Sequence, residues 1–228
     1  MKQKTSGQVI LTTMLLCIAG TAGNYGLIRL SGGLGLGLFL DTVFTVMVTF
    51  SGGVWAGIVT ALLSQATYSF ADSYSWVYYL FSICSIASAL LTRLFMRLFP
   101  KECAPVRLFN GRSPPERTAA EQPGKDSFFA RMIMLFLLSL SMCVLISVLG
   151  GLIAAFLGLV LRSPVSDAPP ETYFKLGLLR QGLSLTAAEI LARLPVNLVD
   201  RFISVFGAYG VSLLLKRALQ RKKPTKIY

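Results

Sequence analysis

Six apolar segments divide this chain, and they restrict its fold more strongly than any other feature. They cover residues 9–30, 33–50, 54–71, 76–99, 128–161 and 190–215. A helix needs about 20 predominantly apolar residues to cross a bilayer, and each segment comes close to or exceeds that length. The segments do not alternate between apolar and polar residues, as the strands of a transmembrane barrel do. The sequence therefore predicts an all-α membrane protein with six transmembrane helices in a compact bundle.

The distribution of basic residues predicts the orientation. The net charge is +12, which is also typical of nucleic-acid-binding proteins. Most Lys and Arg residues, however, lie beside the spans, where the positive-inside rule explains them. We predict one integral domain over residues 1–228 in the cell membrane, with both termini and the linker 100–127 cytoplasmic and the connection 162–188 external. The first apolar segment continues to about Leu30, so we expect an uncleaved span rather than a signal peptide.

Signatures of catalysis and of cofactor binding are missing from the sequence. The chain has no His, and its four cysteines are scattered without a CxxC pair. Glycines alternate at Gly33, Gly35 and Gly37, but no strand precedes them and no GK[ST] motif follows. They favour a close backbone approach or a broken helix beside a cavity. We predict no enzymatic activity, no metal site and no cofactor.

The last apolar segment carries a face of polar residues. Glu189, Arg193, Asn197, Asp200 and Arg201 recur at helical spacing. Ionisable groups in a membrane span normally face a protein interior or a water-filled cavity. The capping-box pattern that starts at Thr186 favours a capping role for Glu189.

Polar residues from other segments are predicted to lie at the same depth. In the predicted topology, Asp41 and Gln65 fall in the outer halves of their spans, level with the polar face of the last one. This favours an outward-facing polar cavity that binds a small solute. Its predicted lining is Asp41, Gln65, Arg193, Asn197, Asp200 and Arg201, with Arg193 or Arg201 pairing any anionic group. The competing interpretation is a buried ion-pair network, for example Asp41 with Arg193 or Arg201.

A small-residue pair in the first segment is a candidate docking face. Ala19 and Gly23 are four residues apart, a spacing that lets two helix backbones approach closely. The partner is either another subunit or a neighbouring helix of the same bundle.

Two stretches resemble a known family. They are Gly35-Leu-Gly-Leu-Phe-Leu-Asp41-Thr-Val-Phe-Thr with Gly52-Gly-Val-Trp-Ala-Gly57, and Pro195-Val-Asn-Leu-Val-Asp200-Arg-Phe-Ile-Ser-Val-Phe-Gly-Ala-Tyr209. They are similar to spans of the substrate-binding S components of energy-coupling-factor (ECF) transporters. The resemblance implies a subunit that captures a solute near the outer surface and works with a transmembrane coupling subunit and two cytoplasmic ATPases.

The resemblance also implies how the parts work together. S components typically dock on the coupling subunit through an Ala-x-x-x-Ala motif in the first span, and Ala19-x-x-x-Gly23 stands at that place here. Without His, a nickel or cobalt substrate is disfavoured and a small organic solute is expected. The partner subunits would use the ATP, and no nucleic acid is expected. The alternative is a stand-alone membrane sensor or scaffold with no transport role.

Overall fold

The computed structural model describes residues 6–71, 76–103, 106, 125–160 and 169–221. Most of the predicted cytoplasmic linker, residues 162–168 of the predicted external connection and both ends of the chain lie outside these residues. The elements are α1 (Ser6–Gly33), α2 (Val43–Gly52), α3 (Val54–Ala71), η1 (Trp76–Phe81), α4 (Ser82–Leu98), α5 (Pro100–Cys103), α6 (Lys125–Leu159), α7 (Pro169–Arg180) and α8 (Leu185–Arg221). The described part of the chain is helical and contains no strand, as the sequence predicted.

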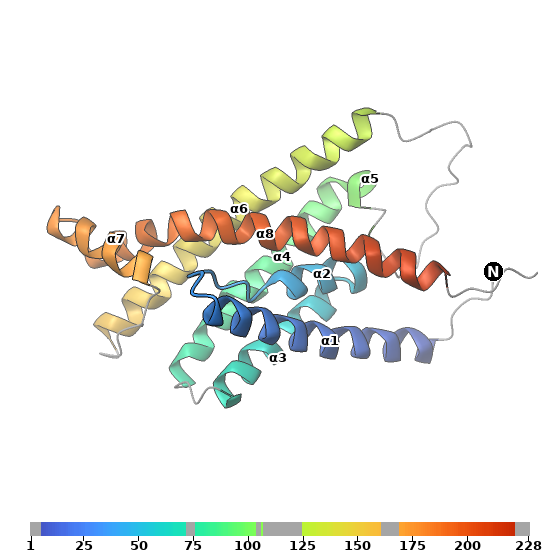
Figure 1. Ribbon diagram of the computed structural model, residues 1–228, viewed down its shortest axis with the longest axis horizontal. Helices are drawn as coiled ribbons and strands as arrows, with labels where there is room; N and C mark the ends of the chain where they lie inside the picture. Colours follow the sequence, from blue (N-terminus) through green and yellow to red (C-terminus); the bar gives the residue numbers. More distant parts are fainter. Residues whose placement is uncertain (1–5, 72–75, 104–105, 107–124, 161–168, 222–228) are drawn as a thin grey trace, which may run out of the picture.

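The helices run back and forth along one long axis. The start of α1 and the end of α8 lie at the same end of the bundle, and α7 lies at the other (Figure 1). Among the described residues, four helical stretches are long and apolar enough to cross a membrane: 7–33, 79–98, 128–159 and 185–219. These lengths and compositions indicate a membrane protein.

The second predicted span is a helix of only half the expected length. Helix α2 has 10 residues, or about 15 Å at 1.5 Å per residue, whereas the hydrocarbon core of a bilayer is about 30 Å thick. The preceding residues 34–42 are irregular and include a left-handed backbone at Gly35, Gly37 and Leu40, with φ of 64°, 62° and 48°. Glycine adopts this conformation without steric cost, so the alternating glycines break the helix. The second predicted span, residues 33–50, is therefore broken, which is one of the two arrangements that its glycines favoured.

Glycines of the neighbouring turn and helix let α2 pack deeply inside the bundle. A Cβ atom added at Gly57 of α3 would lie 1.9 Å from Oγ1 of Thr49, so only glycine fits there. The turn between α2 and α3 is a single residue, Gly53, with φ of 96°. Eight of the ten residues of α2 are buried. The half-helix is thus an internal element, in contact with α1, α3, α4 and α8.

Apolar side chains form both the core and the outer surface. The core joins α2, α6 and α8 through residues such as Phe50, Leu138 and Val205. At the surface, the side chains of Trp55 and Phe70 are 78 % and 73 % exposed, whereas the charged residues Asp200 and Arg201 of α8 are fully buried. A water-soluble protein would not bury charges while exposing so many large apolar residues. This pattern suits a lipid environment.

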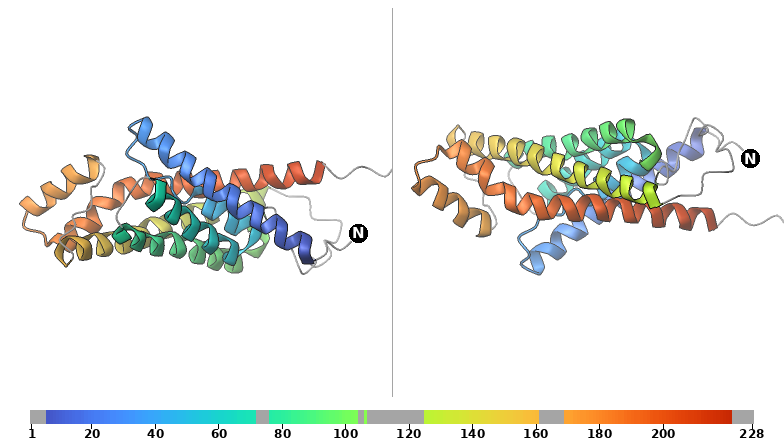
Figure 2. Two further views of the ribbon diagram at one scale, coloured as in Figure 1. Left: turned by 90° about the horizontal axis from the view of Figure 1, so that it is seen from below. Right: turned by 90° about the horizontal axis from the view of Figure 1, so that it is seen from above.

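Helices α7 and α8 form a hairpin at the end of the bundle away from the start of α1 (Figures 1 and 2). Tyr173, Phe174 and Leu176 of α7 are exposed, while Glu171 and Lys175 bind residues of α8. Glu171 and Lys175 therefore face the protein, whereas the three apolar side chains face outward, which is the arrangement expected where a helix meets lipid.

Candidate functional site

Two charged clusters surround the N-terminal half of α8. The first, which we name the loop–α8 cluster, comprises the Leu40 backbone N–H, Asp41, Thr42, Asp200 and Arg201. Oδ1 of Asp200 accepts a hydrogen bond of 2.8 Å from the Leu40 N–H. The Arg201 guanidinium donates to Thr42 Oγ1 and Asp200 Oδ2, and its Nη2 lies 3.4 Å from Asp41 Oδ1. The irregular segment before α2 is thus fastened to α8 by charge-assisted hydrogen bonds.

The second, the α7–α8 cluster, comprises Glu171, Lys175, Glu189 and Arg193. Arg193 Nη1 lies 3.4 Å from Glu171 Oε2, and Nη2 lies 3.5 Å from Glu189 Oε2. Lys175 Nζ lies 3.1 Å from Glu189 Oε1. The side chains are at most 15 % exposed, so these pairs are shielded from water and attract each other more strongly than surface pairs. They hold α7 against α8.

Neutral hydrogen bonds join the remaining helices. Asn197 Nδ2 donates to Ser147 Oγ on α6 at 2.9 Å. The buried Asn24 of α1 donates to Thr45 and Ser64 at 2.9 and 3.1 Å and accepts from the Phe44 N–H at 2.9 Å. A buried amide without partners would be costly in an apolar environment, so these bonds fix how α1, α2 and α3 pack.

Helix α4 contributes Cys84 to the space between the clusters. A Cβ added at Gly150 of α6 would lie 3.6 Å from Arg193 Cδ and 4.0 Å from Cys84 Sγ. Cys84 also lies within electrostatic range of Asp41 and Arg201. Charged and thiol groups from α4, the segment before α2, and α8 therefore share one region of the interior.

Five of the six predicted solute-binding residues lie in this region or next to it. Asp41, Asp200 and Arg201 form one cluster, Arg193 belongs to the other, and Asn197 lies on α8 between them. Gln65 is separate, because α3 packs mainly against α1, α2 and α4 rather than against α8. The sequence left open whether Asp41 pairs with Arg193 or Arg201, and the structure pairs it with Arg201.

The predicted capping role of Glu189 is wrong. Helix α8 begins at Leu185, and Oγ of Ser184 accepts a hydrogen bond of 3.3 Å from the Ala187 N–H. Ser184 is therefore the capping residue, two residues earlier than the Thr186 pattern suggested. Glu189 lies inside the helix, where it binds Lys175 and Arg193.

The two residues of the small-residue pair have different surroundings. A Cβ added at Gly23 would lie 2.6 Å from the Phe44 ring, so Gly23 serves the internal packing of α1 on α2. Ala19 is exposed on the outer side of α1. Only Ala19 is therefore available to a partner.

Sequence reasoning missed Glu171, Lys175, Thr42 and Ser147 as partners of the α8 residues. The sequence weakly indicates Glu171 and Lys175 as partners, because their spacing of four places both on one face of a helix. It gives no indication of Thr42 and Ser147, since short hydroxyl side chains are common in spans.

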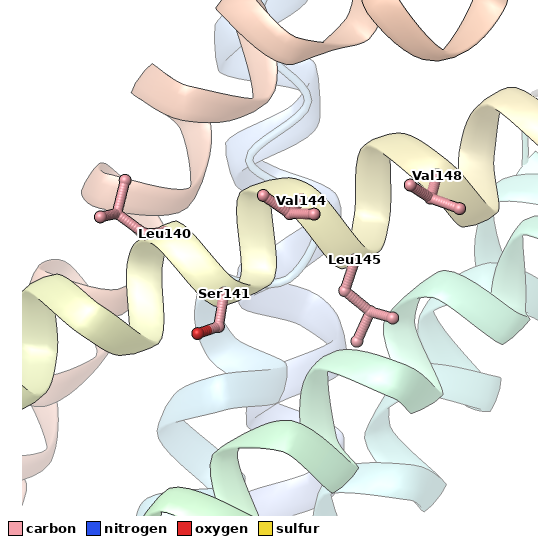
Figure 3. Close-up of a pocket in the computed structure, with 5 residues that line it drawn as sticks. All are labelled: Leu140, Ser141, Val144, Leu145 and Val148. Atoms are coloured by element: carbon pink, nitrogen blue, oxygen red, sulfur yellow. The ribbon is translucent and has the colours of Figure 1, made fainter. Parts of the chain in front are cut away.

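A groove on the surface of α6 is unrelated to these clusters. Its volume is about 530 Å³, and it is lined by Leu140, Ser141, Val144, Leu145 and Val148, all on one helix (Figure 3). Val144 is 57 % exposed. The lining contains no charged group, so the groove suits a lipid chain better than a polar solute.

Within the described residues, no group of three or more His, Cys, Asp or Glu side chains could hold a metal ion. No protein-family model, curated protein or solved structure matches the chain.

Proposed function

We propose that this chain is the substrate-capturing membrane subunit of an ECF-type importer, with six passes and both termini in the cytoplasm. It binds a small organic solute near the outer surface of the cell membrane. A transmembrane coupling subunit and two cytoplasmic ATPases then drive uptake. The chain itself acts as a binding subunit rather than as an enzyme.

The interrupted second pass carries this proposal. Irregular backbone is tolerated at membrane depth only where protein buries it or where it lines a cavity. Transporters place their solute sites at such breaks, because the freed backbone groups and nearby charges can contact a ligand. Here the break at residues 34–42 meets Asp200 and Arg201 of α8, which are the residues that the sequence nominated for the site.

The test is co-purification of the full chain from its native membrane. A complex with one coupling subunit and two ATPases is expected, and native mass spectrometry of the chain is expected to find a retained small molecule. Ala19→Leu should reduce capture of the coupling subunit without lowering thermal stability. The matched variant Ala22→Leu changes another exposed small residue of α1 and tests whether the effect is specific to position 19. A chain that always purifies alone and empty contradicts the proposal.

One observation favours the alternative, a sensor or scaffold without transport. The charged residues of α8 bind other residues of the same chain, as they would if their role were only to hold the bundle together. In that case, no small molecule is retained, and substitutions in the clusters lower stability without changing any binding.

A further inference from the structure

The two charged clusters differ in their charge balance. Among the described residues, the α7–α8 cluster contains two carboxylates and two cationic side chains, whose formal charges cancel. The loop–α8 cluster contains the carboxylates of Asp41 and Asp200 but only one cation, Arg201. Among the described residues, Arg201 is the cationic side chain that lies against both Asp41 and Asp200. The described residues therefore leave one negative charge in this cluster without a counter-charge.

An isolated negative charge in a protein interior is costly unless a positive group accompanies it. The side chains of Asp200 and Arg201 are 0 % and 3 % exposed, whereas that of Asp41 is 25 % exposed. The Asp41–Arg201 contact of 3.4 Å is also longer than a strong charge-assisted hydrogen bond. Asp41 is therefore the carboxylate that an incoming cation can reach.

A second observation points to a missing partner. Ser204 lies one helical turn beyond Asp200, on the same face of α8. Its side chain is fully buried, and its Oγ has no hydrogen-bond partner. Nε of Arg201 is likewise buried without a partner. Buried polar atoms normally have partners, so the Ser204 hydroxyl offers an unused oxygen acceptor one helical turn from Asp200.

The same contacts disfavour an anionic solute. We expected Arg193 or Arg201 to pair an anionic group, but both guanidinium groups already bind carboxylates of this chain. An anion would have to displace these partners and would add to the excess negative charge. A bare metal ion fits no better, because Asp41 and Asp200 alone supply too few ligands and Arg201 lies against both.

We propose that the loop–α8 cluster binds the positively charged ammonium group of a small organic solute. Asp41 is its counter-ion, and Ser204 Oγ accepts one of its hydrogen bonds. This inference rests on the proposed function, because it assigns a charge to the solute of that same site. An ammonium group donates hydrogen bonds only, and the groups available here, a carboxylate and a hydroxyl oxygen, are acceptors.

The test measures binding of ammonium probes to the purified full chain. Methylammonium, ethanolammonium and spermidine chlorides are compared with sodium chloride and sodium acetate at equal ionic strength, by calorimetry and thermal unfolding. At least one ammonium probe is expected to bind and to raise the unfolding temperature above that in sodium chloride, while acetate has no effect. Asp41→Asn should weaken that binding about ten- to a hundredfold, the effect of losing one hydrogen bond to a charged group.

A second variant covers the case in which Asp41→Asn does not fold. Ser204→Ala removes a hydroxyl that makes no hydrogen bond in this structure, so the fold should persist while the affinity for the ammonium probe falls. Leu214→Ala, at an exposed position of the same helix, is the control and should leave affinity unchanged.

Three results would overturn the inference. They are no binding of any ammonium probe beyond sodium chloride, binding that Asp41→Asn and Ser204→Ala leave intact, and stabilisation by acetate instead. If the chain still purifies with a coupling subunit and two ATPases, only the inference that the solute is positively charged is refuted. If it purifies alone and without a small molecule, the proposed function fails as well.

Discussion

The backbone N–H of Leu40 donates a 2.8 Å hydrogen bond to Oδ1 of Asp200, across 160 positions of sequence. Leu40 has a left-handed backbone with φ of 48°, a conformation that costs a non-glycine residue about 1–2 kcal/mol. The bond to a buried carboxylate stabilises this conformation. It also fixes the position at which the irregular segment before α2 changes to helix.

Removing the Asp200 carboxylate is predicted to destabilise the protein severely. Asp200→Ala leaves the Leu40 N–H without its acceptor and takes one of the two carboxylates from the buried Arg201. Loss of one partner from a buried ion pair costs about 3–5 kcal/mol. The measurement is the free energy of unfolding in detergent. Val199→Ala, at a neighbouring position that is 51 % exposed, is the control, and an equal effect of both substitutions would contradict this role.

The Glu171–Arg193 pair is predicted to hold α7 in place. Glu171→Gln should increase hydrogen exchange across residues 169–180, because it removes the charge that draws α7 toward α8. A double-mutant cycle with Arg193→Gln should give a coupling energy of about 0.5–3 kcal/mol, the range for residues in contact. Leu176→Ala, which changes an exposed side chain of α7, should not change exchange. A coupling energy near zero would show that other contacts hold α7.

Two glycines of α6 are predicted to respond in opposite ways to the same substitution. A Cβ at Gly151 would lie 2.7 Å from Cα and 2.8 Å from N of Ile190, so Gly151→Ala forces α6 and α8 apart. We expect a loss of about 1–3 kcal/mol, as for other overpacked sites. A Cβ at Gly158 meets nothing within 4 Å, so Gly158→Ala should be neutral or should stabilise by up to about 1 kcal/mol through helix propensity. Thermal unfolding of both variants tests whether α6 and α8 pack this closely at Gly151. Equal losses of stability in the two variants would refute it.

The proposed orientation is testable by labelling introduced cysteines. The four native cysteines are buried and should react slowly with a membrane-impermeant maleimide. Gln181→Cys, beyond the end of α7, should be labelled in intact cells. Lys101→Cys, at the opposite end of the bundle on α5, should be labelled only after the membrane is opened. Both native residues are exposed. The reverse pattern would place both termini outside.

The sequence by itself determined the class of fold and the extent of most helices. Long apolar runs have few alternatives in a bilayer, because every backbone group must be hydrogen-bonded within the segment. The expected span 54–71 and helix α3 have the same bounds, and the long final helix was expected as well. The polar face of α8 was also readable, since residues at helical spacing must share a side.

Only the tertiary structure decided which partners these residues have. Helical spacing places Arg193 and Arg201 on α8, but it does not show that Glu171 binds the first and that Asp41 and Thr42 bind the second. Those contacts depend on where α7 lies and on where the chain before α2 stops being helical. The charge balance of each cluster follows from them, because it is a property of side chains brought together from distant parts of the chain.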